Sequence, residues 1–97
     1  MTGNDMRRER FRLGQTLATP GALAAIEQSG EALGDLLKRH RCGDWCETCR
    51  EDAQTNEDAL EGGGRVFSVY RLRDGTKIWI ITEADRTATT ALLPDEY

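Results

Sequence analysis

The last third of the chain, residues 65–97, has the clearest pattern of apolar and polar positions. Two runs rich in β-branched and aromatic residues flank the pair Asp74-Gly75. This arrangement is typical of a hairpin, because glycine readily adopts the positive φ that a tight turn needs. A third run, from Thr87 to Leu93, follows a polar break and ends before Pro94. The pattern predicts a three-stranded antiparallel β-meander.

A two-residue turn at Asp74-Gly75 also predicts the register, because it places Tyr70 opposite Trp79. Successive side chains of a strand point to opposite faces of the sheet. The face predicted to cover the helices carries Phe67, Val69, Ile78 and Ile80. The other face carries Ser68, Tyr70, Leu72, Trp79 and Ile81. The Tyr70/Trp79 face is a candidate for a half-exposed binding surface; a cross-strand aromatic pair that only stabilises the sheet is the favoured interpretation.

Helical spacing precedes this region. Thr19 before Pro20 indicates a helix start, since threonine caps free N–H groups and proline fits the first helical position. The predicted helices are Pro20–Gln28, Glu31–His40 and Cys49 to about Glu61. We therefore predict an α+β fold with two or three N-terminal helices packed on one face of the meander. Residues 1–14 are expected to form a flexible basic tail and residues 15–97 a single domain.

Charge narrows the classes of partner. The 97 residues carry a formal net charge of −4, with an acidic block at residues 47–61 and a short arginine-rich run at residues 7–12. Nucleic-acid coating needs clustered basic residues, so a protein partner is favoured over nucleic acid. The longest apolar runs are too short to span a membrane, and no signal peptide is recognisable, so we expect a cytoplasmic protein. We expect no cofactor, and a monomer or a homodimer.

One cluster of residues has the chemistry of a metal site. It consists of four soft ligands within ten positions: His40, Cys42, Cys46 and Cys49. Cys46-x-x-Cys49 has the spacing of a zinc knuckle, but structural zinc sites normally join two ligand pairs from separate segments. A small zinc-binding module therefore remains an alternative, and incidental free cysteines are the favoured interpretation.

Metal-independent RNA cleavage is a second alternative. It needs proton-transfer groups and a cation for the phosphate. His40, the single histidine, is a candidate for proton transfer at neutral pH. Arg65 and Arg86 are candidates for holding phosphate, and Ser68 for orienting it. The simpler interpretation of His40 is a cation at the C-terminal end of a helix.

Three further residues are candidates for a binding site. Asp44-Trp45 offers a ligand-stacking ring beside a carboxylate, although the favoured interpretation is a turn with the tryptophan packed at the helix–sheet seam. Arg86 is a candidate for displaying a recognition charge, and pinning of its own turn is the favoured alternative. Together with Tyr70 and Trp79, these residues complete the set that we predict for binding.

Several motifs resemble those of a family of small bacterial proteins. They are ATPGAL at 18–23, H-x-x-GDW at 40–45, N-x-x-AL at 56–60, and KIWIITEADR with TT-x-LLP-x-EY in the last third. The family is commonly labelled plasmid-related or hypothetical and has no assigned activity. The resemblance implies an accessory role on a mobile element. The chain departs from the family pattern at Cys46, where relatives usually have glycine.

The predicted architecture also resembles, at the level of fold, the barnase–EndoU–colicin–RelE-like nucleases. A resemblance of fold does not carry chemistry with it, because unrelated functions recur on one fold. The sequence therefore favours a small accessory protein that binds a macromolecular partner. A toxin-like RNase is the main alternative.

Overall fold

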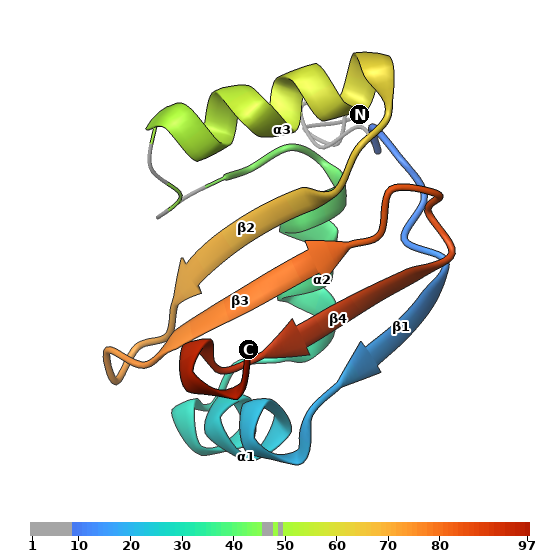
Figure 1. Ribbon diagram of the computed structural model, residues 1–97. Coiled ribbons are helices and arrows are strands. Elements are labelled where there is room, and N and C mark those ends of the chain that lie inside the picture. The colour runs from blue at the N-terminus through green and yellow to red at the C-terminus, as the bar shows by residue number, and fades with distance from the viewer. Residues whose placement is uncertain (1–8, 46–47, 49) are drawn as a thin grey trace, which may run out of the picture.

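The computed structural model describes residues 9–45, 48 and 50–97, and forms an α+β fold built on a four-stranded mixed sheet (Figure 1). The strands are β1 (Gln15–Ala18), β2 (Val66–Arg71), β3 (Lys77–Thr82) and β4 (Ala88–Leu92). Strands β2, β3 and β4 form the predicted antiparallel meander. The sequence analysis missed β1, which pairs in parallel with β4 and makes the spatial order β1-β4-β3-β2.

The helices lie close to their predicted segments. They are α1 (Pro20–Ser29), α2 (Leu33–Arg41) and α3 (Arg50–Gly62), and a short 3₁₀ helix, η2 (Pro94–Glu96), follows β4. Thr19 caps α1 as predicted, because its Oγ1 accepts a hydrogen bond from the Ala22 N–H at 3.1 Å. None of the helices in the described ranges has the length and apolar content needed to cross a bilayer.

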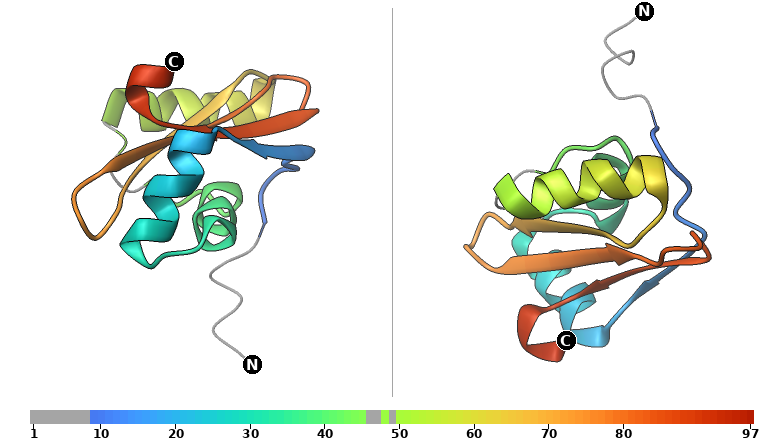
Figure 2. Two further views of the ribbon diagram at one scale, coloured as in Figure 1. Left: turned by 90° about the horizontal axis from the view of Figure 1, so that it is seen from below. Right: turned by 45° about the horizontal axis from the view of Figure 1, so that its top comes forward.

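Helices α1 and α2 cover one face of the sheet, and α3 lies apart from them. Helices α1 and α2 lie against what we call the inner face, whereas α3 runs beside the edge strand β2 (Figure 2). The opposite side, here called the outer face, is turned toward the viewer in Figure 1, with η2 at the end of β4. The apolar core lies between the inner face and the helices and contains Ala22, Ile26, Leu36, Tyr70, Leu72, Ile78, Ile80 and Ala91.

The predicted register of the hairpin is wrong by one residue. Tyr70 lies opposite Ile78, and Val69 lies opposite Trp79. The loop has three residues instead of two: the Gly75 N–H bonds to the Leu72 carbonyl, and Gly75 then has a φ of 93°. A turn followed by a glycine in the left-handed region is a common three-residue hairpin connection.

This shift reverses the predicted orientation of β2. A slip of one residue exchanges the two faces of a strand. Phe67 and Val69 therefore lie on the outer face, and Ser68 and Tyr70 on the inner face, where both side chains are fully buried. The predicted placement of Ile78 and Ile80 toward the helices is confirmed.

Side chains close the β2 edge of the sheet. The Asn56 side-chain amide donates to the Phe67 carbonyl, and its oxygen accepts the Phe67 N–H at 2.8 Å. Two residues further along β2, the Val69 N–H donates to Thr48 Oγ1 at 3.0 Å. These contacts occupy main-chain groups that an edge strand otherwise leaves open.

Residues 9–14, which the sequence analysis assigned to a flexible tail, lie against the fold. Leu13 is buried, and the Phe11 ring packs edge-on against the His40 ring at 5.2 Å. The Arg10 N–H donates to the Arg41 carbonyl at 2.7 Å, and the Arg10 guanidinium pairs with Glu57. This segment leads directly into β1. Residues 1–8 lie outside the described part of the chain.

Candidate functional site

His40 ends the buried stripe of α2 and lies under the inner face of the sheet with no exposed surface. Its Nδ1 is 2.6 Å from Ser68 Oγ, and its Nε2 is 2.8 Å from Thr82 Oγ1. Thr82 Oγ1 lies 2.7 Å from Thr89 Oγ1, which donates to the Leu13 carbonyl at 2.7 Å. A single chain of hydrogen bonds therefore crosses the inner face.

The Leu13 carbonyl at the end of this series of hydrogen bonds determines which group donates in each of them. A carbonyl only accepts, so the one hydroxyl proton of Thr89 is used there, and Thr82 must donate to Thr89. Thr82 Oγ1 then accepts from His40, which places the imidazole proton on Nε2. Nδ1 is left as an acceptor for the Ser68 hydroxyl. The geometry thus assigns a neutral His40 with the Nε2–H tautomer.

Burial reinforces this assignment. Removal from water lowers the pKa of His40 to about 3, and the charge of Arg86 lowers it further. Two candidates of the nuclease hypothesis, His40 and Ser68, do lie together at hydrogen-bond distance. Both side chains are fully buried, so substrate has no access to them. The pair stabilises the core, and the nuclease hypothesis loses its proton-transfer group.

Arg86 has a structural role as well. Its φ of 60° places it in the left-handed region, at the turn between β3 and β4. Its Nη1 donates to the carbonyls of Gly64 (2.5 Å), Glu83 (3.1 Å) and Ala84 (3.2 Å), and its Nη2 to that of Ala59 (3.1 Å). One guanidinium therefore joins its own turn to the end of α3, where a cation meets the negative end of the helix dipole. These bonds occupy the donors that phosphate would need.

The predicted binding residues Asp44 and Trp45 lie just after the C-terminal end of α2, close to His40. The Asp44 carbonyl accepts the Tyr70 hydroxyl at 2.6 Å, and its carboxylate accepts from Arg39 Nε at 2.8 Å. Trp45 donates from Nε1 to Glu57 Oε2 at 2.9 Å, and its ring meets the His40 ring edge-on. The prediction that Tyr70 faces outward beside Trp79 is therefore wrong, because Tyr70 is a core residue.

Of the four candidate zinc ligands, His40 and Cys42 lie in the described part of the chain. Cys46 and Cys49 lie outside the described residues, and Cys42 is the half-buried C-cap residue of α2. Across residues 9–45, 48 and 50–97, no group of three or more histidine, cysteine or acidic side chains is arranged to hold a metal ion. Both ring nitrogens of His40 are already hydrogen-bonded.

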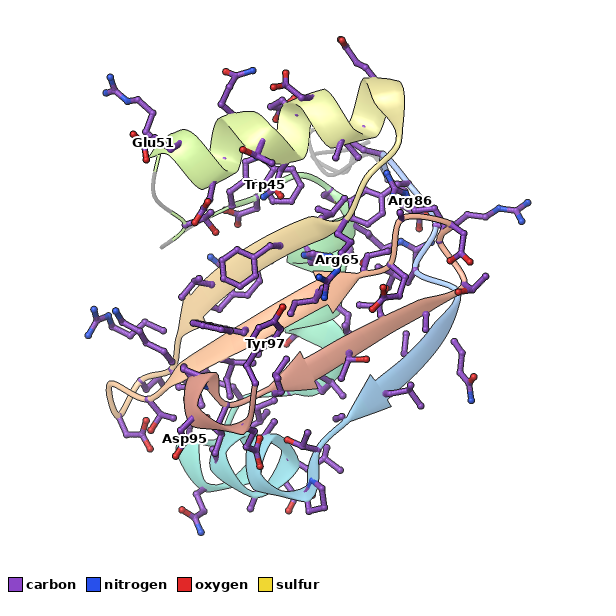
Figure 3. All side chains as sticks on the ribbon, viewed as in Figure 1. Trp45, Glu51, Arg65, Arg86, Asp95 and Tyr97 are labelled. Carbon is purple, nitrogen blue, oxygen red and sulfur yellow. The ribbon has the colours of Figure 1, made fainter. Side chains whose placement is uncertain are left out.

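The outer face carries the most site-like feature of the described chain. Phe67 and Trp79 meet edge-to-face at 5.1 Å, and Trp79 meets Tyr97 at 5.7 Å. These rings line a pocket of about 270 Å³ together with Ile81, Arg65 and Asp52. Figure 3 shows Arg65 and Tyr97 lying over the sheet. We call this feature the aromatic pocket.

The rim of the aromatic pocket has a distinct charge. Helix α3 carries five acidic residues and one basic residue, a net charge of −4. That value equals the net charge of the whole chain, so the 12 acidic and 12 basic residues elsewhere cancel. Asp52 of α3 lines the pocket, and Arg65 Nε lies 3.7 Å from the Glu83 carboxylate oxygen Oε1. The net negative charge of the chain is therefore equal to that of α3, the helix whose Asp52 lines the pocket.

Of the six residues lining the pocket, the sequence analysis named Arg65 and Trp79 as candidates and placed Ile81 on the same face as Trp79, and it missed Asp52, Phe67 and Tyr97. Phe67 was assigned to the core because of the register error. Tyr97 was overlooked because it follows Pro94, after the last strand, where strand alternation gives no placement. A three-residue loop ending in Gly75 was the signal that would have placed Phe67 correctly.

Comparisons with protein-family models, with curated proteins and with solved structures gave no match for this chain. The resemblance to plasmid-related proteins and the fold-level resemblance to nucleases therefore stay predictions. The geometry and chemistry of the aromatic pocket are the basis for assigning a function.

Proposed function

We propose that this is a non-catalytic binding protein, and that its aromatic pocket takes up an apolar side chain of a protein partner. The observation that carries the proposal is the array of the half-buried rings of Phe67 and Trp79 and the exposed ring of Tyr97 on the outer face of the sheet. Half of the six aromatic residues of the chain gather there. Tyr97 is 69% exposed, which is unusual for a ring that serves only packing.

The chemistry of the pocket favours this class of ligand. Its lining combines three rings and Ile81 with one cation and one anion. Apolar pockets with a few polar groups at the rim are typical of sites that hold an anchoring side chain. Edge-to-face rings also add attraction beyond their buried area.

The charge of α3 specifies the partner further. Glu51, Asp52, Asp58 and Glu61 are exposed on this helix. Their field repels the phosphates of nucleic acid and attracts basic side chains. We therefore expect a protein segment with one large apolar anchor flanked by lysine or arginine. An accessory role on a mobile element, as the family resemblance implies, is compatible with such a protein.

A peptide panel tests the proposal. The probes are short peptides with a central Trp, Leu or Ser between flanks of either lysine or glutamate, and binding is followed by NMR chemical shifts. We expect the lysine-flanked Trp peptide to bind and to shift the signals of Trp79 and Ile81. Removing the ring by Tyr97→Ser should weaken binding about tenfold.

Matched controls separate binding from folding. Leu23, 40% exposed on α1, is the control, so Leu23→Ser should leave peptide binding unchanged. Equal binding by the Tyr97→Ser variant, or no shift with any peptide, would overturn the proposal. Binding of a single-stranded oligonucleotide at the same signals would assign the pocket to nucleic acid instead.

A further inference from the structure

The two edge strands of the sheet differ in whether side chains bind their outward main-chain groups. At the β2 edge, side chains of Asn56 and Thr48 occupy main-chain groups of the strand. Strand β1 forms the other edge, and within residues 9–45, 48 and 50–97 no helix or strand lies beyond it (Figure 1). Its four residues, Gln15–Ala18, contain no charge and no proline. Natural edge strands commonly carry such features to prevent pairing with another chain.

Pairing with β4 fixes which main-chain groups of β1 face outward. The Gln15 N–H donates to the Thr87 carbonyl and the Thr19 N–H to the Ala91 carbonyl, both at 3.0 Å. In a parallel ladder, alternate residues bond to the same neighbour. The N–H and C=O groups of Thr16 and Ala18 therefore point away from β4, toward the open edge.

We propose that this edge pairs with β1 of a second copy of the chain, in antiparallel orientation and with Leu17 on the two-fold axis. In this register Thr16 of one protomer lies opposite Ala18 of its partner, and the two exchange both hydrogen bonds. The two-fold axis repeats the exchange, which gives four hydrogen bonds. The two sheets become one continuous eight-stranded sheet.

Leu17 supports this register in particular. Its side chain is 44% exposed, and it is one of three exposed large hydrophobic residues in the described part of the chain. It lies on the outer face, beside Thr90 of β4. Its position on the axis makes it a non-hydrogen-bonded pair with itself, in which Cα atoms approach to about 4.5 Å and side chains touch. Pairing would therefore cover an apolar side chain that the monomer leaves in water.

The other side of the strand leaves room for a neighbour. A hollow of about 330 Å³ lies beside Thr16. Its other lining residues are Glu9, Leu13, Gly34, Leu37, Lys38 and Arg41. The inner side of β1 is thus only partly covered by α2. A pairing of two four-residue strands buries little area, so we expect a weak dimer that forms at high protein concentration.

Sedimentation velocity and amide hydrogen exchange on the full chain, from about 10 μM to about 1 mM, test the proposal over the range expected for a small interface. Dimers should appear at the upper end of that range. Hydrogen exchange at the Thr16 and Ala18 amides should slow with concentration, whereas the Leu17 amide, which faces β4, should not change. Leu17→Lys places two like charges on the axis and should weaken the dimer at least about tenfold.

Leu23→Lys introduces the same charge on α1 and should leave the dimer intact. If the chain stays monomeric up to about 1 mM, or if it dimerises equally well with Leu17→Lys, the proposal is wrong. A dimer whose added protection falls on β2 instead of β1 would also overturn it, because it would locate the interface at the opposite edge.

Discussion

Lowering the pH from 7 to 5 should destabilise this protein through a single side chain, His40. In the unfolded chain a histidine takes up a proton near its ordinary pKa of 6.5, whereas in the fold the pKa of His40 is lowered to about 3 by burial. Between these values the unfolded state binds more protons than the folded state. The free energy of unfolding is therefore fully retained above about pH 6.5 and falls as the pH drops toward 3.

The size of the effect follows from the two pKa values. Each pH unit between them costs about 1.4 kcal/mol, so the whole transition is worth on the order of 5 kcal/mol. At pH 5 about 2 kcal/mol should already be lost. The carboxylates of Asp74, Asp85 and Glu96 accept hydrogen bonds from Thr76, Thr87 and Thr19, which lower their pKa values from 3.8, 3.8 and 4.5. Their contribution is lost mainly below about pH 4.5, outside the window used here.

Urea unfolding at pH 7, 6 and 5 measures the loss directly. His40 is the single histidine of the chain, so the slope in this window can be attributed to it. His40→Gln keeps a neutral donor and acceptor and should abolish most of the slope. NMR provides a readout that does not depend on a variant: the ring should keep its proton on Nε2 from pH 7 to below pH 5.

Two results would refute the reasoning. One is a stability that does not change between pH 7 and 5 in the wild-type chain. The other is an imidazole that titrates near 6.5 while the protein remains folded. Either result would mean that water reaches the His40 ring. The series of buried hydrogen bonds from Ser68 to the Leu13 carbonyl would then not exist in solution.

Four further substitutions test the packing and the hydrogen bonds. Gly14→Ala should cost more than about 2 kcal/mol, because φ is 68° and a Cβ would lie 2.5 Å from main-chain atoms of the β3–β4 turn; Gly34→Ala, with open space around it, should instead stabilise by about 0.5–1 kcal/mol. Thermal denaturation measures both, and equal melting temperatures would contradict the steric argument. Tyr70→Phe should lose about 1 kcal/mol in urea unfolding, because the hydroxyl donates to the Asp44 carbonyl; an unchanged midpoint would mean that the bond contributes nothing. Asn56→Ala should cost about 2–3 kcal/mol and speed hydrogen exchange in β2, and slow exchange there would show that the edge is closed in another way.

Local signals in the sequence predicted most of the helices and strands. The Thr19-Pro20 start of α1 and the order of β2, β3 and β4 depend on capping and on alternation over a few residues, and these are confirmed. Strand β1 was not predictable in this way. Its four residues, Gln15–Ala18, are mostly exposed and carry no alternation, and pairing with β4, more than 70 residues away, makes them a strand.

The candidate site was harder to predict, because it depends on register. Asp74-Gly75 fits both a two-residue and a three-residue loop, and the choice between them decides which face of β2 carries Phe67. The polar side chains on the strands also indicate which face of β2 is buried. Ser68 and Thr82 share a face with Ile78 and Ile80, and a buried histidine needs such partners.

The two proposals, if both hold, have a joint consequence for binding. A two-fold axis through Leu17, perpendicular to the paired strands and the sheet, keeps both outer faces on the same side of the eight-stranded sheet. The two aromatic pockets would then be presented together to one surface. A partner with two basic-flanked anchors would bind with an effective concentration set by the span between them, which raises avidity without any new contact. Leu17→Lys should therefore weaken binding of a two-anchor peptide and leave binding of a one-anchor peptide unchanged, whereas Tyr97→Ser should weaken both.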